Sequence, residues 1–371
     1  MAEENFYQNL IDHLRNWIFD VPHSPYLMPM LKMRFTPEEA ELCSKIPFLP
    51  HTAEELSKKL DIPLDNLTIK LDELAKKGII YRLEGSTAIR YSFRDLIFSF
   101  YRMPGWKGID DEWNRKLAPY TNKYYIDALA ADYTGHATQG LRTIPINKTV
   151  EDTRTIMPYE NILKLIDNFK YYTVTTCCCR HRHNLDPDFE QCKHETLNCL
   201  HFDRLGEYIV QNGLGKEITK EETLEILKRA ADAGLVHGIS NSIEGIDTIC
   251  NCCSCCCVNF ESIVKMPGII PRGHQKSNYI REMNEEKCIG CGLCVELCPM
   301  KALELREKRV IFTPERCIGC GVCVHKCPEE AVILIRRNEE QDYPRDPREE
   351  VYRFLQERGR DPLEIFKKNS I

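Results

Sequence analysis

The residues of this sequence best suited to chemistry are eight cysteines in two runs near its C-terminal end. Each run has the spacing C-x2-C-x2-C-x3-C-P, and the second repeats the first 29 residues further on. The runs contain Cys288, Cys291, Cys294 and Cys298 before Pro299, and Cys317, Cys320, Cys323 and Cys327 before Pro328. Three thiolates two residues apart on a tight turn reach three irons of one cubane, and the fourth cysteine points to a neighbouring cluster. The spacing therefore predicts two interleaved [4Fe–4S] clusters.

The interleaving assigns four ligands to each predicted cluster. Cluster A receives Cys288, Cys291, Cys294 and Cys327, and cluster B receives Cys317, Cys320, Cys323 and Cys298. Structural zinc explains this pattern poorly, because zinc sites use two pairs of ligands and not two runs of four. Residues 281–336 closely resemble bacterial two-cluster ferredoxins, which implies a pseudo-twofold fold and one-electron transfer at low potential.

Eleven further cysteines lie upstream, outside the ferredoxin spacing. They are Cys177, Cys178, Cys179, Cys192, Cys199, Cys250, Cys252, Cys253, Cys255, Cys256 and Cys257. The pattern resembles a group of ferredoxin-type proteins of anaerobes with a winged-helix-like N-terminus, a C-x-C-R strand end, a C-x6-C pair and an I-C-N-C-C-x-C-C stretch. The resemblance implies metal ligands at Cys177, Cys179, Cys192, Cys199, Cys250, Cys252, Cys253, Cys255 and Cys256. It also places Arg180 at the cofactor, where its charge would stabilise an anionic cluster or an acidic substrate.

The upstream cysteines leave several interpretations open. Two further cubanes and one larger cluster are both chemically sensible, and the alternatives are unligated core thiols or zinc ligands. Consecutive residues point to opposite sides of an extended chain, so the pairs Cys252-Cys253 and Cys255-Cys256 are each expected to serve two centres. Nearby histidines suggest a Rieske-like ligand, namely His181, His183, His194 and His201. No Rieske box is present, however, and a surface or hydrogen-bonding role is the better interpretation.

Cysteine usage also indicates the compartment. The chain has 371 residues and 20 cysteines, 19 of them after position 176. The N-terminus MAEENFYQNL has no basic or apolar stretch of a secretory signal, and adjacent cysteines are poor disulfide partners. Metal ligation in a reducing compartment fits better. No apolar run approaches the ~20 residues of a membrane helix, so we expect a cytoplasmic protein. The formal net charge of −6 points to no bulk partner such as nucleic acid.

The elements that must position these cysteines predict an α+β protein. We expect an N-terminal helical segment (1–35), a winged-helix-like domain (36–103), a connecting region (104–170), a Cys-rich iron–sulfur domain (171–280), the two-cluster ferredoxin domain (281–336) and a charged tail (337–371). Within the Cys-rich part, a strand over 171–176 leads into the first cysteines, and a capped helix spans 217–234. A strand is expected near 142–146, a helix over 158–169 and another over 347–358. The tail is interpreted as a solvated extension or a docking arm.

The winged-helix hypothesis rests on three helices followed by a hairpin. Helices are expected to begin at Thr36 and Thr52 and to run from Pro63 to Lys77, followed by strands over 79–83 and 89–93. This unit resembles the winged-helix domains of bacterial regulators. Residues 36–103 nevertheless carry 10 basic and 11 acidic residues, and the third helix is acidic. Because phosphate neutralisation supplies most non-specific affinity for DNA, a structural or protein-docking role is favoured. Cys43, alone in this unit, is expected to pack in the core.

Three function classes follow. The leading hypothesis is an electron-transfer subunit that relays electrons between a redox partner protein or complex and the upstream centre. The second is an oxidoreductase with catalysis at an unusual upstream iron–sulfur cluster, and the third is a redox-sensing regulator. Neither a G-x-G-x-x-G sequence nor a P-loop is present, so nicotinamide chemistry would have to come from a partner.

Overall fold

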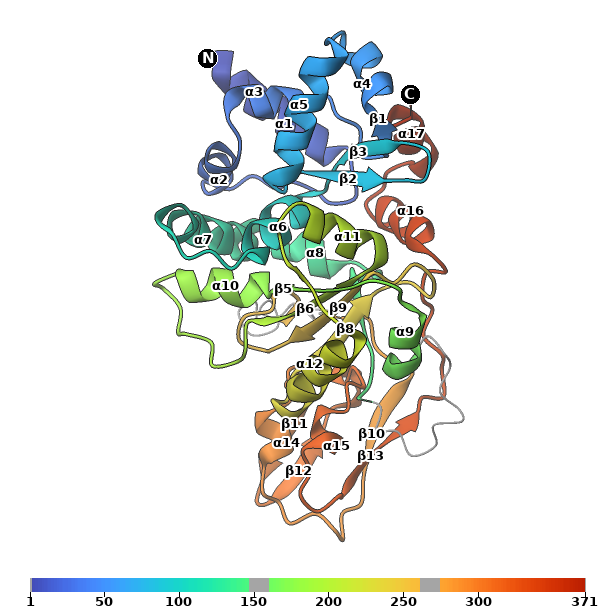
Figure 1. The fold of residues 1–371 in the computed structure, drawn as a ribbon. Helices are drawn as coiled ribbons and strands as arrows, with labels where there is room; N and C mark the ends of the chain where they lie inside the picture. Colours follow the sequence, from blue (N-terminus) through green and yellow to red (C-terminus); the bar gives the residue numbers. More distant parts are fainter. Residues whose placement is uncertain (1, 147–159, 261–273, 371) are drawn as a thin grey trace.

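A computed structural model describes residues 2–146, 160–260 and 274–370. The N-terminal helices, a central sheet and the ferredoxin-like part follow one another down the molecule, and the C-terminal helices return to the N-terminal end (Figure 1). The start of the helix predicted over 158–169 lies outside the described residues. Among those described, no helix has the length and apolar character needed to cross a membrane.

The N-terminal part combines helices with a small antiparallel sheet of strand order β1-β3-β2. Its elements are α1 (Ala2–Arg15), α2 (Leu27–Arg34), α3 (Pro37–Cys43), β1 (His51–Thr52), α4 (Ala53–Leu60), α5 (Leu64–Lys76), β2 (Ile80–Glu84) and β3 (Ile89–Phe93). The expected starts at Thr36 and Thr52 are confirmed, because each side chain closes a reciprocal capping box with a glutamate three residues on. The winged-helix assignment itself stays a prediction.

This N-terminal part shares its core with segments distant in sequence. Cys43 is fully buried there, as expected. Tyr208, on α11 (Asp203–Gln211), stacks edge-on against Tyr81 and donates hydrogen bonds to the carbonyls of Ala75 and Ile80. The end of α5 is therefore fixed to the Cys-rich part.

The region after β3 is almost entirely helical, which the sequence left unassigned. It contains the π-helix η1 (Ile97–Arg102), α6 (Met103–Trp106), α7 (Glu112–Tyr124), the π-helix η2 (Tyr125–Leu129) and α8 (Ala130–Gly135). The Trp106 ring lies 4.9 Å from the ring of His201 in the central sheet. These helices therefore cover one face of that sheet.

The central sheet has six strands in the order β4-β8-β9-β6-β5-β7, and every neighbouring pair is antiparallel. The strands are β4 (Leu141–Thr143), β5 (Tyr172–Thr176), β6 (Leu197–Phe202), β7 (Lys216–Glu217), β8 (Val236–Ser240) and β9 (Thr248–Cys252). Of these, β5 was predicted as the strand over 171–176, and β4 overlaps the strand expected near 142–146 but begins and ends earlier. Apolar residues such as Val174, Leu200 and Ile249 pack on one face against α9 (Ile162–Asn168) and α12 (Lys220–Asp232). Because strand residues alternate, the other face is left for polar and sulfur side chains.

The ferredoxin-like part repeats one small unit. Its elements are β10 (Tyr279–Met283) paired with β13 (Val332–Arg336), β11 (Leu303–Arg306) paired with β12 (Arg309–Phe312), the short helices α14 (Leu293–Glu296) and α15 (Val322–His325), and the 3-10 turn η6 (Pro314–Arg316). Each short helix begins after a glycine with φ of 78°, at Gly292 and Gly321. The two halves thus have the same local geometry.

The C-terminal tail does not match the expectation of a solvated extension. Helix α16 (Pro347–Glu357) was predicted, and α17 (Pro362–Lys368) follows it. Phe354, Leu355 and Ile365 are buried in the N-terminal core. Arg358 forms an ion pair with Asp132 at 3.0 Å. The apolar positions hidden among the charges at helical spacing explain why the tail packs.

Candidate metal centres

The four cysteines assigned to cluster A line one cavity. Cys288, Cys291, Cys294 and Cys327 surround it, and Met283, Val310 and Val332 complete its apolar wall. Cys291 is exposed and the neighbouring Ile289 is 61% exposed, so this cavity lies at the surface.

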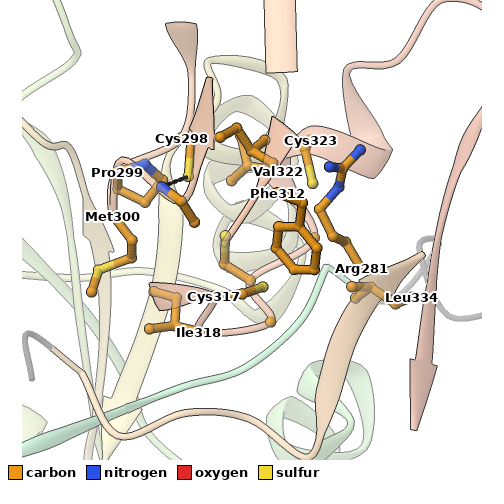
Figure 2. A pocket seen from close by; sticks show the side chains of 15 residues that line it. Arg281, Cys298, Pro299, Met300, Phe312, Cys317, Ile318, Val322, Cys323 and Leu334 are labelled. Carbon is orange, nitrogen blue, oxygen red and sulfur yellow. Dashed lines mark hydrogen bonds between the residues drawn. The ribbon is translucent and has the colours of Figure 1, made fainter. Parts of the chain in front are cut away.

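A second cavity gathers the four cysteines assigned to cluster B (Figure 2). Cys317, Cys320 and Cys323 come from the second run, whereas Cys298 comes from the first. The crossing of ligands between the two runs is therefore reproduced by the arrangement of the side chains.

Both crossing cysteines accept a backbone hydrogen bond at equivalent positions. The N–H of Ala302 lies 3.3 Å from Cys298 Sγ, and the N–H of Ala331 lies 3.4 Å from Cys327 Sγ. In each case the donor is four residues after the cysteine, beyond the proline. Hydrogen bonds to sulfur stabilise a thiolate and tune the potential of a cluster that it ligates.

Glycine is required at the turn of the second run. Gly319 has a φ of 71°, and a Cβ there would overlap the carbonyl oxygen of Tyr279. The backbone of β10 therefore approaches the cysteine turn too closely for any side chain.

Arg281 was not singled out in the sequence, yet its charge faces both cysteine sets. The residue is 5% exposed, and its Nε and Nη2 atoms have no hydrogen-bond partner among the described residues. Its guanidinium lies beside Cys323 in the cluster B cavity (Figure 2). Burial raises the pKa of Cys294 and that of Cys323, the latter to about 12, while Arg281 opposes this rise at both. A buried cation among thiols fits an anionic cluster on each side of it.

The upstream cysteines fall into two groups, and all members of one group line a large cavity that Cys253 of the other group also reaches. Close thiol pairs connect the seven members of the first group, which are Cys177, Cys178, Cys179, Cys199, Cys250, Cys252 and Cys257. We call it the seven-cysteine centre. Its cavity measures about 310 Å³, against about 30 and 20 Å³ for the two ferredoxin cavities.

Strand register explains how the seven-cysteine centre forms. Cys250 and Cys252 are two residues apart on β9 and so share the sheet face opposite the apolar core. Cys199 on β6 is the neighbour of Cys250, because Leu200 pairs with Ile249. Cys177 follows β5 and precedes α10 (Cys178–Leu185), which brings the first cysteines to the same place.

A histidine that the sequence did not reveal joins the seven-cysteine centre. The ligand atoms of Cys252, Cys257 and His274 lie within 4.8 Å of one another, and all three residues are buried. His274 Nε2 is 3.7 Å from Cys252 Sγ. A Cβ on Gly238 would overlap this imidazole, so the glycine makes room for it.

The second group is the four-sulfur group of Cys192, Cys253, Cys255 and Cys256. Their sulfur atoms all lie within 4.8 Å of one another. Cys253 and Cys256 are buried, whereas Cys255 is exposed. Thiol neighbours lower the pKa of Cys192, with Cys253 as the largest cause.

Arg180 lies between the two groups. It is fully buried, and its Nη1 donates to the carbonyl of Glu195 at 2.9 Å and to Asn198 Oδ1 at 2.8 Å, while Nη2 donates to the carbonyl of Asn251. Burial acts to lower the pKa of Arg180, but Cys177 and Cys253 more than offset it, and the pKa is raised. Its charge thus faces sulfur from both groups.

Of the two pairs of consecutive cysteines, the structure separates one and keeps the other together. Cys252 and Cys253 belong to different groups, as predicted for a chain still extended at the end of β9. Cys255 and Cys256 belong to the same group, because the chain turns after Cys253. Cys178 and Cys257, which were not among the predicted ligands, belong to the seven-cysteine centre.

Two of the histidines considered as Rieske-like ligands have other partners. His201 contacts the hydroxyl groups of Thr175 and Thr248, and His181 contacts the carbonyl of Ile109. These contacts agree with the hydrogen-bonding role that the sequence favoured.

Comparison with known proteins identifies the C-terminal cysteine runs. Residues 287–331 match the family model described as a 4Fe–4S dicluster domain. This part of the chain is a ferredoxin-type iron–sulfur domain. The chain is also 32% identical over 78 residues to one subunit of the ion-translocating oxidoreductase complex of Methanosarcina acetivorans, a match that covers 21% of this chain and 28% of that protein. No solved structure matches the chain. These similarities support an iron–sulfur electron-transfer role.

Proposed function

We propose that this protein relays low-potential electrons between a redox partner and the seven-cysteine centre, through the two clusters of its ferredoxin domain. Cluster A is held by Cys288, Cys291, Cys294 and Cys327, and cluster B by Cys317, Cys320, Cys323 and Cys298. The seven-cysteine centre holds a further iron–sulfur cluster, to which it contributes Cys177, Cys179, Cys199, Cys250 and Cys252 of the predicted set together with Cys178 and Cys257. When bound, these groups supply sites for single electrons.

The observation that carries this proposal is one apolar core shared by two cysteine sets. Cys252 and Cys257 of the seven-cysteine centre are members of one buried apolar cluster, and Cys250 of the same centre packs against it together with Cys298, Cys317 and Cys320 of the cluster B cavity. Phe260 and Met300 belong to this core. Close packing between the two sets favours electron passage from cluster B to the upstream centre.

The opposite end of the ferredoxin domain is suited to a partner. Cys291 and Ile289 beside cluster A are exposed, whereas three of the cluster B cysteines pack against the interior. The order of transfer is then partner, cluster A, cluster B and seven-cysteine centre, in either direction. The similarity to a subunit of an ion-translocating oxidoreductase complex supports an oxidoreductase complex as this partner.

The cavity at the seven-cysteine centre favours a second function, catalysis at the upstream cluster. Its volume of about 310 Å³ compares with about 30 and 20 Å³ for the two ferredoxin cavities. Away from the cysteines, Arg94, Arg102, Asp247 and Glu350 line it. A cavity that holds only a closed cluster needs no such extra space or charge, whereas a small substrate does.

The relay is tested by anaerobic purification, with iron and sulfide counted per chain and a redox titration followed by EPR. The two ferredoxin clusters account for about eight irons. The proposal predicts more than eight, with a signal in addition to those of clusters A and B. Replacing Cys250 and Cys252 together by serine should remove the excess iron and that signal, while the ferredoxin signals remain. A count of eight with no additional signal would overturn the relay to an upstream cluster.

A further inference from the structure

We infer that Cys192, Cys253, Cys255 and Cys256 bind one tetrahedral metal ion of the zinc type and do not ligate an iron–sulfur cluster. The inference rests on the distances within the four-sulfur group and is independent of the proposed relay. Cys192 Sγ lies 3.6 Å from Cys255 Sγ and 4.0 Å from Cys253 Sγ, and Cys255 Sγ lies 3.4 Å from Cys256 Sγ.

These distances are those of a single coordination sphere. A zinc–sulfur bond is about 2.3 Å, so the sulfurs of a tetrahedral Zn(Cys)4 site are about 3.8 Å apart. The three distances of 3.4 to 4.0 Å bracket this value. In a cubane each thiolate binds a different iron, and the cluster core holds the four sulfurs further apart.

The ferredoxin domain provides the comparison within the same molecule. Among the described residues, no three of its eight cysteine sulfurs lie within 4.8 Å of one another, although each set of four lines one cavity. The four-sulfur group meets this limit with all four members. The two kinds of site therefore differ in the spacing of their ligands, as a cluster and a single ion require.

Charge and anchoring around the group fit such an ion. Four thiolates and one divalent cation leave a net charge of −2, and the buried guanidinium of Arg180 interacts with Cys253. The backbone N–H of Cys192 donates to Asn184 Oδ1 at 2.8 Å, which fixes the loop that carries this ligand. With four protein ligands the site is closed, so its role is to tie this loop to the turn that follows β9.

The test uses the full chain, purified anaerobically, with zinc and iron counted and X-ray absorption measured at the zinc edge. We expect about one zinc per chain with four sulfurs near about 2.3 Å and no second metal nearby. Cys255→Ser is the informative variant, because Cys255 is the exposed ligand and its replacement disturbs the core least. It should lose that ion and keep the EPR signals of the ferredoxin clusters. Ser254→Ala, in the same turn, should keep both.

The other outcomes also decide the inference. A mononuclear ferric EPR signal that disappears in Cys255→Ser would support it, with iron in place of zinc. Loss of about four irons and of a cluster signal in that variant would overturn it, because the irons of a cubane are lost together. Alkylation of all four thiols in the metal-containing wild-type protein, without release of an ion, would overturn it as well. This measurement needs no variant to fold.

Discussion

The ferredoxin domain and the Cys-rich part of this protein assemble their sulfur sites in different ways. Each ferredoxin cavity draws three ligands from one short turn and a fourth from its twin, so spacing alone places all of them. The seven-cysteine centre draws its cysteines from β6, from β9 and from the chain that follows β5, and these strands are neighbours only in the folded sheet. The spacing of residues along the chain is enough to predict a local site, whereas a site built across a sheet also depends on the order of the strands. The predictions below test this contrast.

The largest expected effect comes from replacing the cysteine that each run contributes to the cluster of the other run. Cys298→Ser should impair cluster B, although Cys298 lies in the first run, and Cys327→Ser should impair cluster A. Iron counting and EPR of the reduced protein measure this, with loss of the magnetic interaction between the two clusters in both variants. Impairment of cluster A by Cys298→Ser would show that each run binds its own cluster.

Arg180→Met should destabilise the Cys-rich part while leaving the ferredoxin domain folded. The change removes a buried guanidinium that satisfies Glu195, Asn198 and Asn251. Leaving these buried acceptors without a donor lowers the free energy of unfolding by roughly 2–4 kcal/mol. Chemical denaturation measures this loss. Arg229→Met is the matched control, because Arg229 pairs with Glu195 at the surface and its loss should cost no more than about 0.5 kcal/mol.

Gly238→Ala should disturb the seven-cysteine centre through His274. The added Cβ would overlap the imidazole, which must move away from Cys252. Overpacking of this kind costs roughly 1–3 kcal/mol. The EPR signal of the upstream centre should change while those of clusters A and B do not. Gly135→Ala is the control, since nothing lies within 4 Å of its Cβ position. An equal effect of both variants would show that the change does not act through His274.

Glu350→Gln should flatten the pH dependence of stability. Burial, followed by the charges of Asp247 and Asp95, raises the pKa of Glu350 from 4.5 to about 8. Between these values the unfolded chain has released a proton that the folded protein keeps, so wild-type stability falls as pH rises, by roughly 1 kcal/mol per pH unit. The variant should match wild type below pH 4.5 and exceed it increasingly up to about pH 8. Parallel curves from urea titrations across this range would contradict the prediction.

The success of sequence-based prediction follows the same contrast. The capped helices at Thr36 and Thr52, the hairpin after α5 and the strand before Cys177 depend on local patterns, and they were predicted. Strands β6, β8 and β9 were not, because polar residues and cysteines on one face hide their alternation. His274 carries no signal, since it reaches Cys252 only through the packing of the sheet. The packing of the tail was not predicted, because the many charged residues of α16 and α17 masked the apolar positions Phe354 and Leu355.

The central claim is that electrons reach the seven-cysteine centre through cluster B. It is tested most directly by rapid mixing of the protein with a low-potential one-electron donor and freeze-quench EPR, in wild type and in Cys320→Ala. The account predicts that in wild type the ferredoxin signals rise first and the upstream signal follows. In the variant, which lacks a cluster B ligand at the shared core, reduction of the upstream centre should slow by an order of magnitude or more. Equal rates in the two proteins would contradict the account.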